Sequence, residues 1–307
     1  MTSSVVSRVA SPVRRARPRR FLMCPPTFFD VTYAINPWMH PDRRTDTARA
    51  VRQWTALVES YRAFGHRVDL LEPVEGLADM VFTANGATVV DGLVLGARFA
   101  AHQRTAEAAA HVDWHRRFGA SYGGRVVRDA VAVNEAEGDF VVLSDRVLAG
   151  YGFRTAPSAH RELAALTGRE VIGLELVDPR FYHLDVALAV LDDVTDHLAY
   201  YPEAFSDRSR RLLERLFPDA LIATSADAFA FGLNLVSDGL NVFVPTEAGH
   251  LVDALRSSGY RPVRVELDEL VKGGGSVKCC TQEIRPPDVP RTIPTNGPTT
   301  ELPQEAP

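Results

Sequence analysis

Hydrophobic and polar positions along this chain follow two alternating periods in a fixed order. Between residues 47 and 65 the apolar side chains recur every three or four residues, which predicts an amphipathic helix ending at Gly65. A short strand, "RVDLLEP", follows it. Next comes "ATVVDGLVLGARF", where an Asp-Gly pair between two apolar runs predicts a β-hairpin. The pattern therefore predicts a unit made of one helix, one strand and one hairpin.

This unit recurs along the chain. Further helices are predicted at residues 104–118, 158–168, 207–217 and 247–259, each followed by a strand and then by a hairpin or by the last strand, "SVKCCTQEI". The first strand, "RFLMCPP", is available to pair with the last one and close a ring. Units of roughly 45 residues cannot bury both helix and sheet faces alone, so they must share a core. We expect one α/β domain of pseudo-fivefold arrangement, with strands toward the centre and helices outside.

Composition adds limits on class and setting. The chain has 307 residues, 46% of them hydrophobic and 24% charged, which is ordinary for a globular protein. A net charge of −5 indicates no overall nucleic-acid surface, and no apolar run approaches the length of a membrane span. Three cysteines at no disulfide-framework spacing favour a reducing, cytoplasmic setting. Nothing in the sequence indicates an oligomeric state.

The two ends differ from the middle. Residues 1–20 hold six arginines, no acidic residue and no apolar signal segment. We therefore expect residues 1–19 to form a disordered basic arm, with an organelle transit peptide as the alternative. Residues 285–307 are rich in Pro and Thr and are predicted to be a disordered tail. The single folded domain is thereby predicted to cover residues 20–284.

Polar residues stand at one level of the predicted repeat, just before or at the start of successive hairpins. Side chains at one level of a pseudo-symmetric ring face a shared cavity, so we expect them to meet. They are Asn85 in "TAN", Asp139 in "EGD", His183 and Asp185 in "HLD", Asn234 in "GLN", and the strand that carries Cys279.

The segment "GGGSVKCCTQEI" carries two adjacent thiols, Cys279 and Cys280, after three glycines. They could form a vicinal disulfide, bind a metal, pack at a strand end, or supply a nucleophile and a bystander. A zinc site is disfavoured because the chain has no Cys-x-x-Cys spacing. A nucleophile needs a proton carrier. His183 is a candidate, since Asp185 lies two residues on and hence on the same face of the expected strand.

The charges expected around the thiol indicate the ligand. Acidic neighbours would raise a thiol pKa, and a bound cationic guanidinium would resolve that conflict. Arg98 and Arg154, which each follow the outgoing strand of a hairpin, could hold a carboxylate at the other end of the ligand. Such a ligand looks like arginine. The acidic and amide residues concerned are Asp79, Asn85, Glu135, Glu137, Asp139 and Asp185.

Taken together, these motifs resemble the guanidino-group-modifying superfamily of five-bladed pentein proteins, over about residues 20–284. "GGGSVKCCT" is similar to the family's approach to its nucleophile, with Cys279 two residues before Thr281 and Cys280 expected to face away. "HLD" resembles the His-x-Asp motif, which implies His183 as general acid and base and Asp185 as a guanidinium ligand. "DMVFTAN" resembles the substrate segment, with Asp79 and Phe82 in place.

Two departures from the family pattern bear on the reaction. Asn85 stands where deiminases have Asp, and with Asn36 in "INPWM" it looks most like arginine dihydrolase. "EAEGD" is displaced by one residue from the family motif, so Glu135 is the expected carboxylate beside the histidine, with Glu137 as the alternative. The resemblance favours conversion of arginine to ornithine, carbon dioxide and ammonia.

Several other reactions stay open. They are a dimethylargininase or an arginine deiminase giving citrulline, and an amidinotransferase. A non-catalytic pentein binding module, like the ribosome anti-association factor, is the rival of another class, and the joint presence of Cys279, His183 and Asp185 argues against it. The enzymatic route is attack by Cys279 on the guanidinium carbon, a thiouronium intermediate and hydrolysis assisted by His183. The expected partner is a small guanidino substrate, with no cofactor, metal, nucleic acid or membrane.

Overall fold

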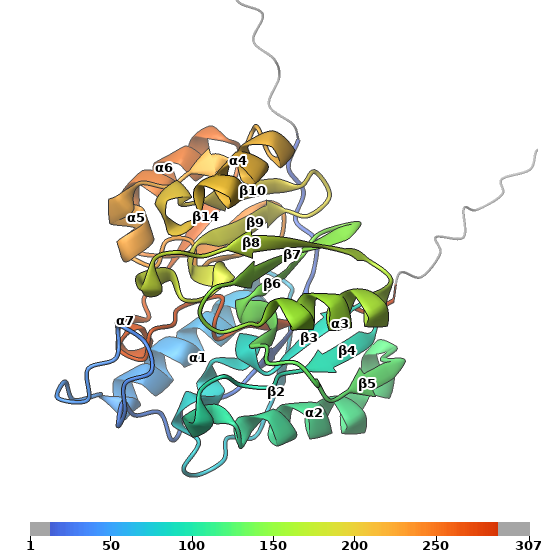
Figure 1. Ribbon diagram of the computed structural model, residues 1–307. Coiled ribbons are helices and arrows are strands. Elements are labelled where there is room, and N and C mark those ends of the chain that lie inside the picture. The colour runs from blue at the N-terminus through green and yellow to red at the C-terminus, as the bar shows by residue number, and fades with distance from the viewer. Residues whose placement is uncertain (1–12, 288–307) are drawn as a thin grey trace, which may run out of the picture.

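The computed structural model describes residues 13–287, and these fold into five three-stranded mixed sheets (Figure 1). Each sheet joins an antiparallel pair to a third, parallel strand. The sheets are β15 (Gln282–Glu283), β1 (Arg20–Met23) and β2 (Arg67–Leu70); β3 (Ala87–Val90), β4 (Leu93–Gly96) and β5 (Val126–Arg128); β6 (Phe140–Val142), β7 (Arg146–Tyr151) and β8 (Glu170–Glu175); β9 (Leu188–Asp192), β10 (His197–Tyr200) and β11 (Leu221–Ile222); and β12 (Val236–Ser237), β13 (Asn241–Pro245) and β14 (Arg261–Val265).

Within each sheet a helix makes the connection to the parallel strand, and all five predicted helices are confirmed. Figure 1 shows α2 and α3 along one side of the molecule and α4 and α6 along another, with strands between them. The helices are α1 (Thr47–Ala63), α2 (Glu107–Phe118), α3 (Pro157–Thr167), α4 (Asp207–Leu216) and α6 (Gly249–Ser257). Two short helices, α5 (Ser225–Phe229) and α7 (Asp268–Val271), were not predicted because each is too short to show a period.

Helix α1 shows how local sequence builds the unit. Its N-terminus is capped by Asp46, whose side chain accepts a hydrogen bond from Arg49 N at 2.8 Å. Its apolar face is buried, with Tyr61 fully covered and Leu57 1% exposed. Burial of side chains of this size contributes roughly 1.5–3 kcal/mol each. The Tyr61 hydroxyl also lies 3.0 Å from Thr281 Oγ1, so the helix is joined to the segment that carries Cys279.

Turn chemistry explains the predicted hairpins. In the β3–β4 turn, Asp91 and Gly92 have φ angles of 52° and 76°, the two positive values that a two-residue hairpin turn requires. The predicted pairing of the first and last strands is also confirmed, because Phe21 of β1 lies opposite Glu283 of β15. Segments from the two ends of the described chain therefore lie in one sheet.

The last predicted strand is mostly wrong. Only Gln282–Glu283 form a strand, and residues 277–280 form a turn in which Cys280 N donates to Ser276 O at 3.1 Å. A side chain distant in sequence causes this: Asn234 Oδ1 accepts from Ser276 N at 3.0 Å and from Cys279 N at 3.1 Å. Those backbone groups are therefore not available to a neighbouring strand.

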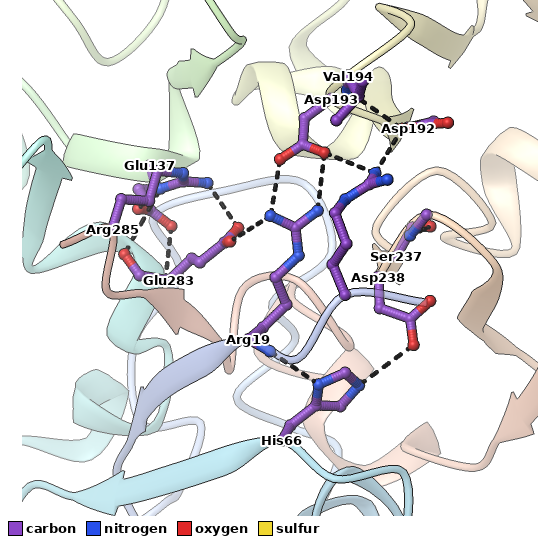
Figure 2. A network of polar contacts seen from close by, with 12 residues as sticks. Arg19, His66, Glu137, Asp192, Asp193, Val194, Ser237, Asp238, Glu283 and Arg285 are labelled. Carbon is purple, nitrogen blue, oxygen red and sulfur yellow. Dashed lines mark hydrogen bonds and ion pairs between the residues drawn. The ribbon is translucent and has the colours of Figure 1, made fainter. Parts of the chain in front are cut away.

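The predicted ends of the fold also need correction. Of the basic arm, residues 1–12 lie outside the described part of the chain, whereas residues 13–19 lie against the domain (Figure 2). Arg17 N donates to Asp238 O at 2.9 Å, and the Arg19 guanidinium binds Asp193 at 2.7 and 2.9 Å. Of the predicted tail, residues 288–307 also lie outside, but Arg285 O accepts from Gly92 N at 2.9 Å. None of the helices between residues 13 and 287 is long and apolar enough to cross a membrane.

Candidate active site

A small pocket of about 250 Å³ lies where the loops that precede the hairpins meet the glycine-rich segment. We call it the candidate pocket. It brings together residues from widely separated parts of the chain, so it exists only in the folded protein. Its walls are Ile35, Asn36, Asp79, Phe82, Asn85, Arg104, Arg154, Tyr182, Gly273, Gly275 and Cys279.

Cys279 is a buried free thiol, 2% exposed. Its Sγ receives a hydrogen bond from Asn234 Nδ2 at 3.1 Å and donates to Asp185 Oδ2 at 3.3 Å. Burial, and then the Asp185 carboxyl, raise the pKa of the thiol well above its ordinary value. A positive charge placed beside this sulfur would act in the opposite direction and lower the pKa.

Asn234 organises the segment that carries the thiol. Besides its bonds to Ser276 N and Cys279 N, its Nδ2 donates to the backbone carbonyl of Asp185 at 3.1 Å, so one amide holds both the turn and the backbone of Asp185. The sequence pattern placed Asn234 at the level of the other polar residues but did not single it out as a site residue. Its repeat position was the available signal.

His183 lies against a carboxylate that Arg154 also holds. His183 Nε2 is 2.7 Å from Glu135 Oε2, and Arg154 Nη1 is 3.0 Å from the same oxygen. Although burial alone would raise it, the hydrogen bond and charge of His183 and the charge of Arg154 hold the pKa of the Glu135 carboxyl well below its usual range. His183 Nδ1 is buried and has no partner among the described residues.

Glu137, the alternative partner for the histidine, lies elsewhere. Its carboxylate binds Lys278 Nζ and Arg285 Nη1, each at 2.6 Å. The structure therefore places Glu135, and not Glu137, beside His183. Asp139 supports the same region, since its Oδ1 accepts from Leu184 N at 3.1 Å.

The expectation that His183 and Asp185 share one face of a strand is wrong. His183 has an extended backbone just before the 3₁₀ turn η7 (Leu184–Val186), which carries Asp185. Because that turn breaks the alternation of a strand, the two side chains diverge: His183 contacts Glu135, and Asp185 contacts the thiol. Asp185 is also absent from the residues that line the candidate pocket.

Asp79 and Asn85 are in the pocket wall with a partner that the sequence did not reveal. Asp79 Oδ2 accepts from Tyr33 Oη at 2.9 Å, Oδ1 is buried without a partner among the described residues, and burial raises the pKa of this carboxyl. Arg104 Nη1 donates to Asn85 Oδ1 at 2.8 Å, and Glu107 holds the same guanidinium at 2.8 Å. The Arg-x-x-Glu spacing in "HQRTAE" was the only local sign of this buried pair.

The glycines are required by close approach. A Cβ on Gly275 would lie 2.5 Å from the Phe82 ring and 2.9 Å from Cys279 Cβ. Gly274 has a φ of +89°, and a Cβ there would lie 2.6 Å from Asn36 Nδ2. Asn36 in turn donates to Gly273 O at 3.2 Å. Asn36 and Phe82 therefore position the glycine segment as well as line the pocket.

Of the two arginines expected to hold a carboxylate, only Arg154 lines the pocket. Its Nη2 donates to Ile35 O at 2.6 Å, and its guanidinium lies 4.9 Å from the centre of the Tyr182 ring. Arg98 is exposed and donates to the carbonyl of Val131. Among residues 13–287 no group of three or more His, Cys, Asp or Glu could hold a metal ion.

The five mixed sheets, the buried thiol and the histidine–carboxylate pair fit a hydrolase of guanidino C–N bonds with the pentein fold, and the comparisons with known proteins show that class. The chain belongs to the dimethylarginine dimethylaminohydrolase family: a model of eukaryotic N,N dimethylarginine dimethylhydrolases matches residues 17–286.

The individual relatives carry the names of two different activities, dimethylarginine dimethylaminohydrolase and arginine dihydrolase. The chain is 53% identical to an N(G),N(G)-dimethylarginine dimethylaminohydrolase of Mycobacterium tuberculosis, with 93% of each chain covered. It is 36% identical to the bifunctional arginine dihydrolase/ornithine cyclodeaminase AgrE of a Nostoc species, over 87% of this chain and 38% of that protein. The product-bound N-terminal domain of ArgZ, a cyanobacterial arginine dihydrolase, superimposes with a TM-score of 0.82 at 33% identity, covering 89% of this chain and all of that domain.

Proposed function

We propose that this enzyme hydrolyses asymmetric dimethylarginine to citrulline and dimethylamine. The observation that carries the proposal is the 53% identity, over nearly the full length of both chains, to a dimethylarginine dimethylaminohydrolase. The arginine dihydrolases are more distant, and the preference for them that the sequence suggested is not supported.

The geometry around Asn85 bears on the dihydrolase argument. That argument assigned the amide of Asn85 to a neutral ureido intermediate. In the structure Asn85 Oδ1 accepts from Arg104, and Nδ2 points to Glu135 O at 3.5 Å. One oxygen lone pair and one N–H of this amide are therefore already directed at protein groups, which leaves it one acceptor and one donor site for a ligand.

In the proposed first half-reaction, a guanidinium enters beside Asp79 and Cys279, and its charge lowers the pKa of the thiol. The thiol proton passes to His183, the thiolate attacks the guanidinium carbon, His183 gives that proton to the substituted nitrogen, and the C–N bond breaks to release dimethylamine. His183 is the proton carrier at Nδ1, because Nε2 is bound to Glu135. The carbon is then held on sulfur as a thiouronium.

In the second half-reaction, water attacks the thiouronium carbon and loses a proton to His183. The C–S bond breaks, citrulline leaves and the sulfur is regenerated. Glu135 keeps the imidazole oriented through both steps. No metal or redox group takes part in this sequence of steps.

Recognition of the amino-acid end of the substrate is assigned to Arg154. Its guanidinium lines the pocket and is suited to a carboxylate. The role of Arg98 in the same task stays a prediction, since its side chain would have to leave the Val131 carbonyl. Replacing Arg154 by Ala should raise KM about tenfold or more for the amino acid and far less for an analogue without the carboxylate.

We further propose that the five sheets are blades of one pentein propeller around the candidate pocket, within a single catalytic domain. The cytoplasmic location predicted from the cysteines remains a prediction. The alternation of helix and hairpin and the pairing of β1 with β15 support the propeller.

Product analysis tests the proposed reaction. The purified enzyme is incubated separately with asymmetric dimethylarginine and with arginine, and the amino acids and amines are separated by chromatography. We expect citrulline and dimethylamine, with kcat/KM for arginine lower by about a hundredfold or more. Cys279→Ser is the control for contaminating activity. Exclusive turnover of arginine would overturn the proposed substrate.

Arginine dihydrolysis is the second candidate, and the presence of Asn85 in the pocket wall is the observation that favours it. If that reading holds, arginine gives ornithine and two ammonia per turnover, and Asn85→Asp shifts the product toward citrulline. If dimethylargininase holds, neither form releases ornithine.

A further inference from the structure

A second cavity lies beyond Asp185, separate from the candidate pocket. It has a volume of about 660 Å³ and shares no lining residue with that pocket. We call it the strand cavity because strands form most of its wall. Its apolar lining comes from Phe21, Phe140, Val141, Val142, Leu188, Ala189, Val190, Leu191, Leu235 and Val236.

Most charges at this cavity neutralise one another (Figure 2). Arg19 binds Asp193 at 2.7 Å and Glu283 at 3.2 Å, and Arg285 binds Glu283 at 2.8 Å. Lys278 also lines the cavity, but its ammonium is held by Glu137 at 2.6 Å. The cations are therefore committed to carboxylates and offer little to an anionic guest.

Asp185 is the exception among the carboxylates of the cavity wall. It is 1% exposed, and within residues 13–287 its Oδ1 has no hydrogen-bond partner and no cationic side chain pairs with it. A buried carboxylate without a counterion is unfavourable by several kcal/mol, on the order of the penalties known for buried charges. A guest that supplies the missing positive charge would bind there.

The walls define the guest's other property. The apolar wall of the cavity suits methyl groups, and the one carboxyl without a counterion, Asp185, suits a single N–H donor. We propose that the strand cavity binds, at Asp185, the amine that leaves the substrate, which becomes a small ammonium ion by taking up a proton from solvent. This inference rests on the proposed function, because that reaction is the source of the amine.

The reaction sequence gives such a site a purpose. When the C–N bond breaks, the rest of the substrate stays bonded to Cys279 and occupies the candidate pocket of about 250 Å³. The amine must move away before water can replace it. Asp185 Oδ2 lies 3.3 Å from the sulfur and Asp185 lines the strand cavity, so this carboxyl contacts both the sulfur and the cavity.

The cavity adjoins a wider groove through which the amine can leave. The groove has a volume of about 1410 Å³ and reaches Pro286 and Pro287 at the end of the described chain. The two spaces have five lining residues in common, which are Arg19, Val142, Asp193, Glu283 and Arg285.

Two measurements test the site, with dimethylammonium chloride as the probe and equimolar sodium chloride as the salt control. The first is inhibition of dimethylarginine turnover. We expect a noncompetitive pattern, because the amine and the substrate occupy different spaces. The second is calorimetric titration of the amine into protein saturated with citrulline, which needs no turnover. If the enzyme binds the amine but does not turn over dimethylarginine, the proposed function is wrong. If it turns over dimethylarginine but does not bind the amine, the proposed site is wrong.

Filling the cavity should remove this binding. In Val190→Trp we expect the inhibition constant of dimethylammonium to rise at least about tenfold, with KM for substrate changed less than about twofold. Val190 is a partly buried strand residue in the cavity wall. Ala189→Phe is the second filling variant, to be used if Val190→Trp does not fold.

Val263→Trp is the matched control, since Val263 is a partly buried valine of strand β14 that does not line the strand cavity. It should bind the amine like the native enzyme. Competitive inhibition, no amine binding to the citrulline complex, or equal binding in native and filled variants would each overturn the proposal.

Discussion

Two regions near Cys279 differ in whether their buried charged groups are paired. The candidate pocket and its surroundings keep polar atoms without partners among the described residues, including Asp79 Oδ1, His183 Nδ1 and Asp185 Oδ1. The second region, the arm network, pairs each charged group with an opposite one (Figure 2). It consists of Arg17, Arg19, Glu137, Asp192, Asp193, Glu283 and Arg285.

The ionisation of the carboxyls follows this difference. Burial raises the pKa of Asp185 to about 7, because no cation pairs with it. Burial acts on Asp193 too, but hydrogen bonds and charge from Arg19 and Arg17 outweigh it and lower the pKa to about 2. Buried groups without a counter-charge at a site are available to a ligand at the expense of stability, and paired charges do the reverse. The contrast concerns charge, since Nε of Arg17 and of Arg19 also has no hydrogen-bond partner among the described residues.

The two regions are joined through Glu137. Its carboxylate binds Arg285 of the arm network and Lys278, the residue before Cys279. The buried groups without a counter-charge near Cys279 are therefore connected, through Glu137, to a region in which the charges are paired. Four substitutions, taken from the largest expected effect to the smallest, test this division of roles.

Cys279→Ser should lower kcat by about a thousandfold or more, because the hydroxyl is a far weaker nucleophile than a thiolate. Cys280→Ser is the matched control and should keep most of the activity, since Cys280 does not line the candidate pocket. Steady-state rates with the preferred substrate measure both. Equal losses in the two variants would remove the assignment of a single nucleophile.

Arg19→Met should lower the free energy of unfolding by about 3 kcal/mol, because it leaves Asp193 and Glu283 partly buried without that cation. Denaturant titration measures the loss, and kcat should change less than about twofold. Arg67→Met is a control on the neighbouring strand, where the arginine is 61% exposed in its ion pair with Asp69. A large loss of kcat in folded Arg19→Met would show that the two regions do not separate.

Glu135→Gln should reduce kcat by about a hundredfold, because the amide cannot hold His183 as a carboxylate does. The readout is the pH profile of kcat, which should change shape as well as height if Glu135 supports the proton carrier. Glu137→Gln is the comparison two residues further on, within the 3₁₀ turn η5 (Ala136–Gly138) that Glu135 precedes, and it should act mainly on stability. A uniform drop at all pH values would mean that Glu135 is only structural.

Asp139→Asn should stabilise the protein by about 2 kcal/mol at alkaline pH and have little effect near pH 4. Burial raises the pKa of Asp139 to about 6, against an unfolded value of 3.8. The folded state therefore binds more protons between these values, so stability falls as pH rises through that window. The asparagine keeps the acceptor for Leu184 N without the charge. Thermal melts at both pH values check the sign.

Much of the fold could be predicted because it depends on neighbours in sequence. The face of α1 and the Asp91-Gly92 turn are set within a few residues, by side-chain period and by backbone conformation. The same holds for finding Cys279, which the glycines and the following Thr281 marked by motif.

The arrangement of the site depends on partners that lie far away in the chain, and local pattern carries no information about them. Asn234 holds the turn that carries Cys279 although it lies 45 residues away in the chain. The periodicity of "SVKCCTQEI" contains no sign of this contact. Arg104 is buried because Glu107 and Asn85 receive its charge and donors, whereas Arg98 stays exposed on a carbonyl.

Sequence alone thus determined the order of the main elements and the pairing of first and last strands, and it singled out Cys279 as the candidate thiol, because these follow from local period, turn chemistry and motif. Tertiary structure decided which carboxylate meets His183, where Asp185 points and how residues 13–19 pack. Those outcomes depend on burial and on which charges find partners, and both are properties of the assembled chain.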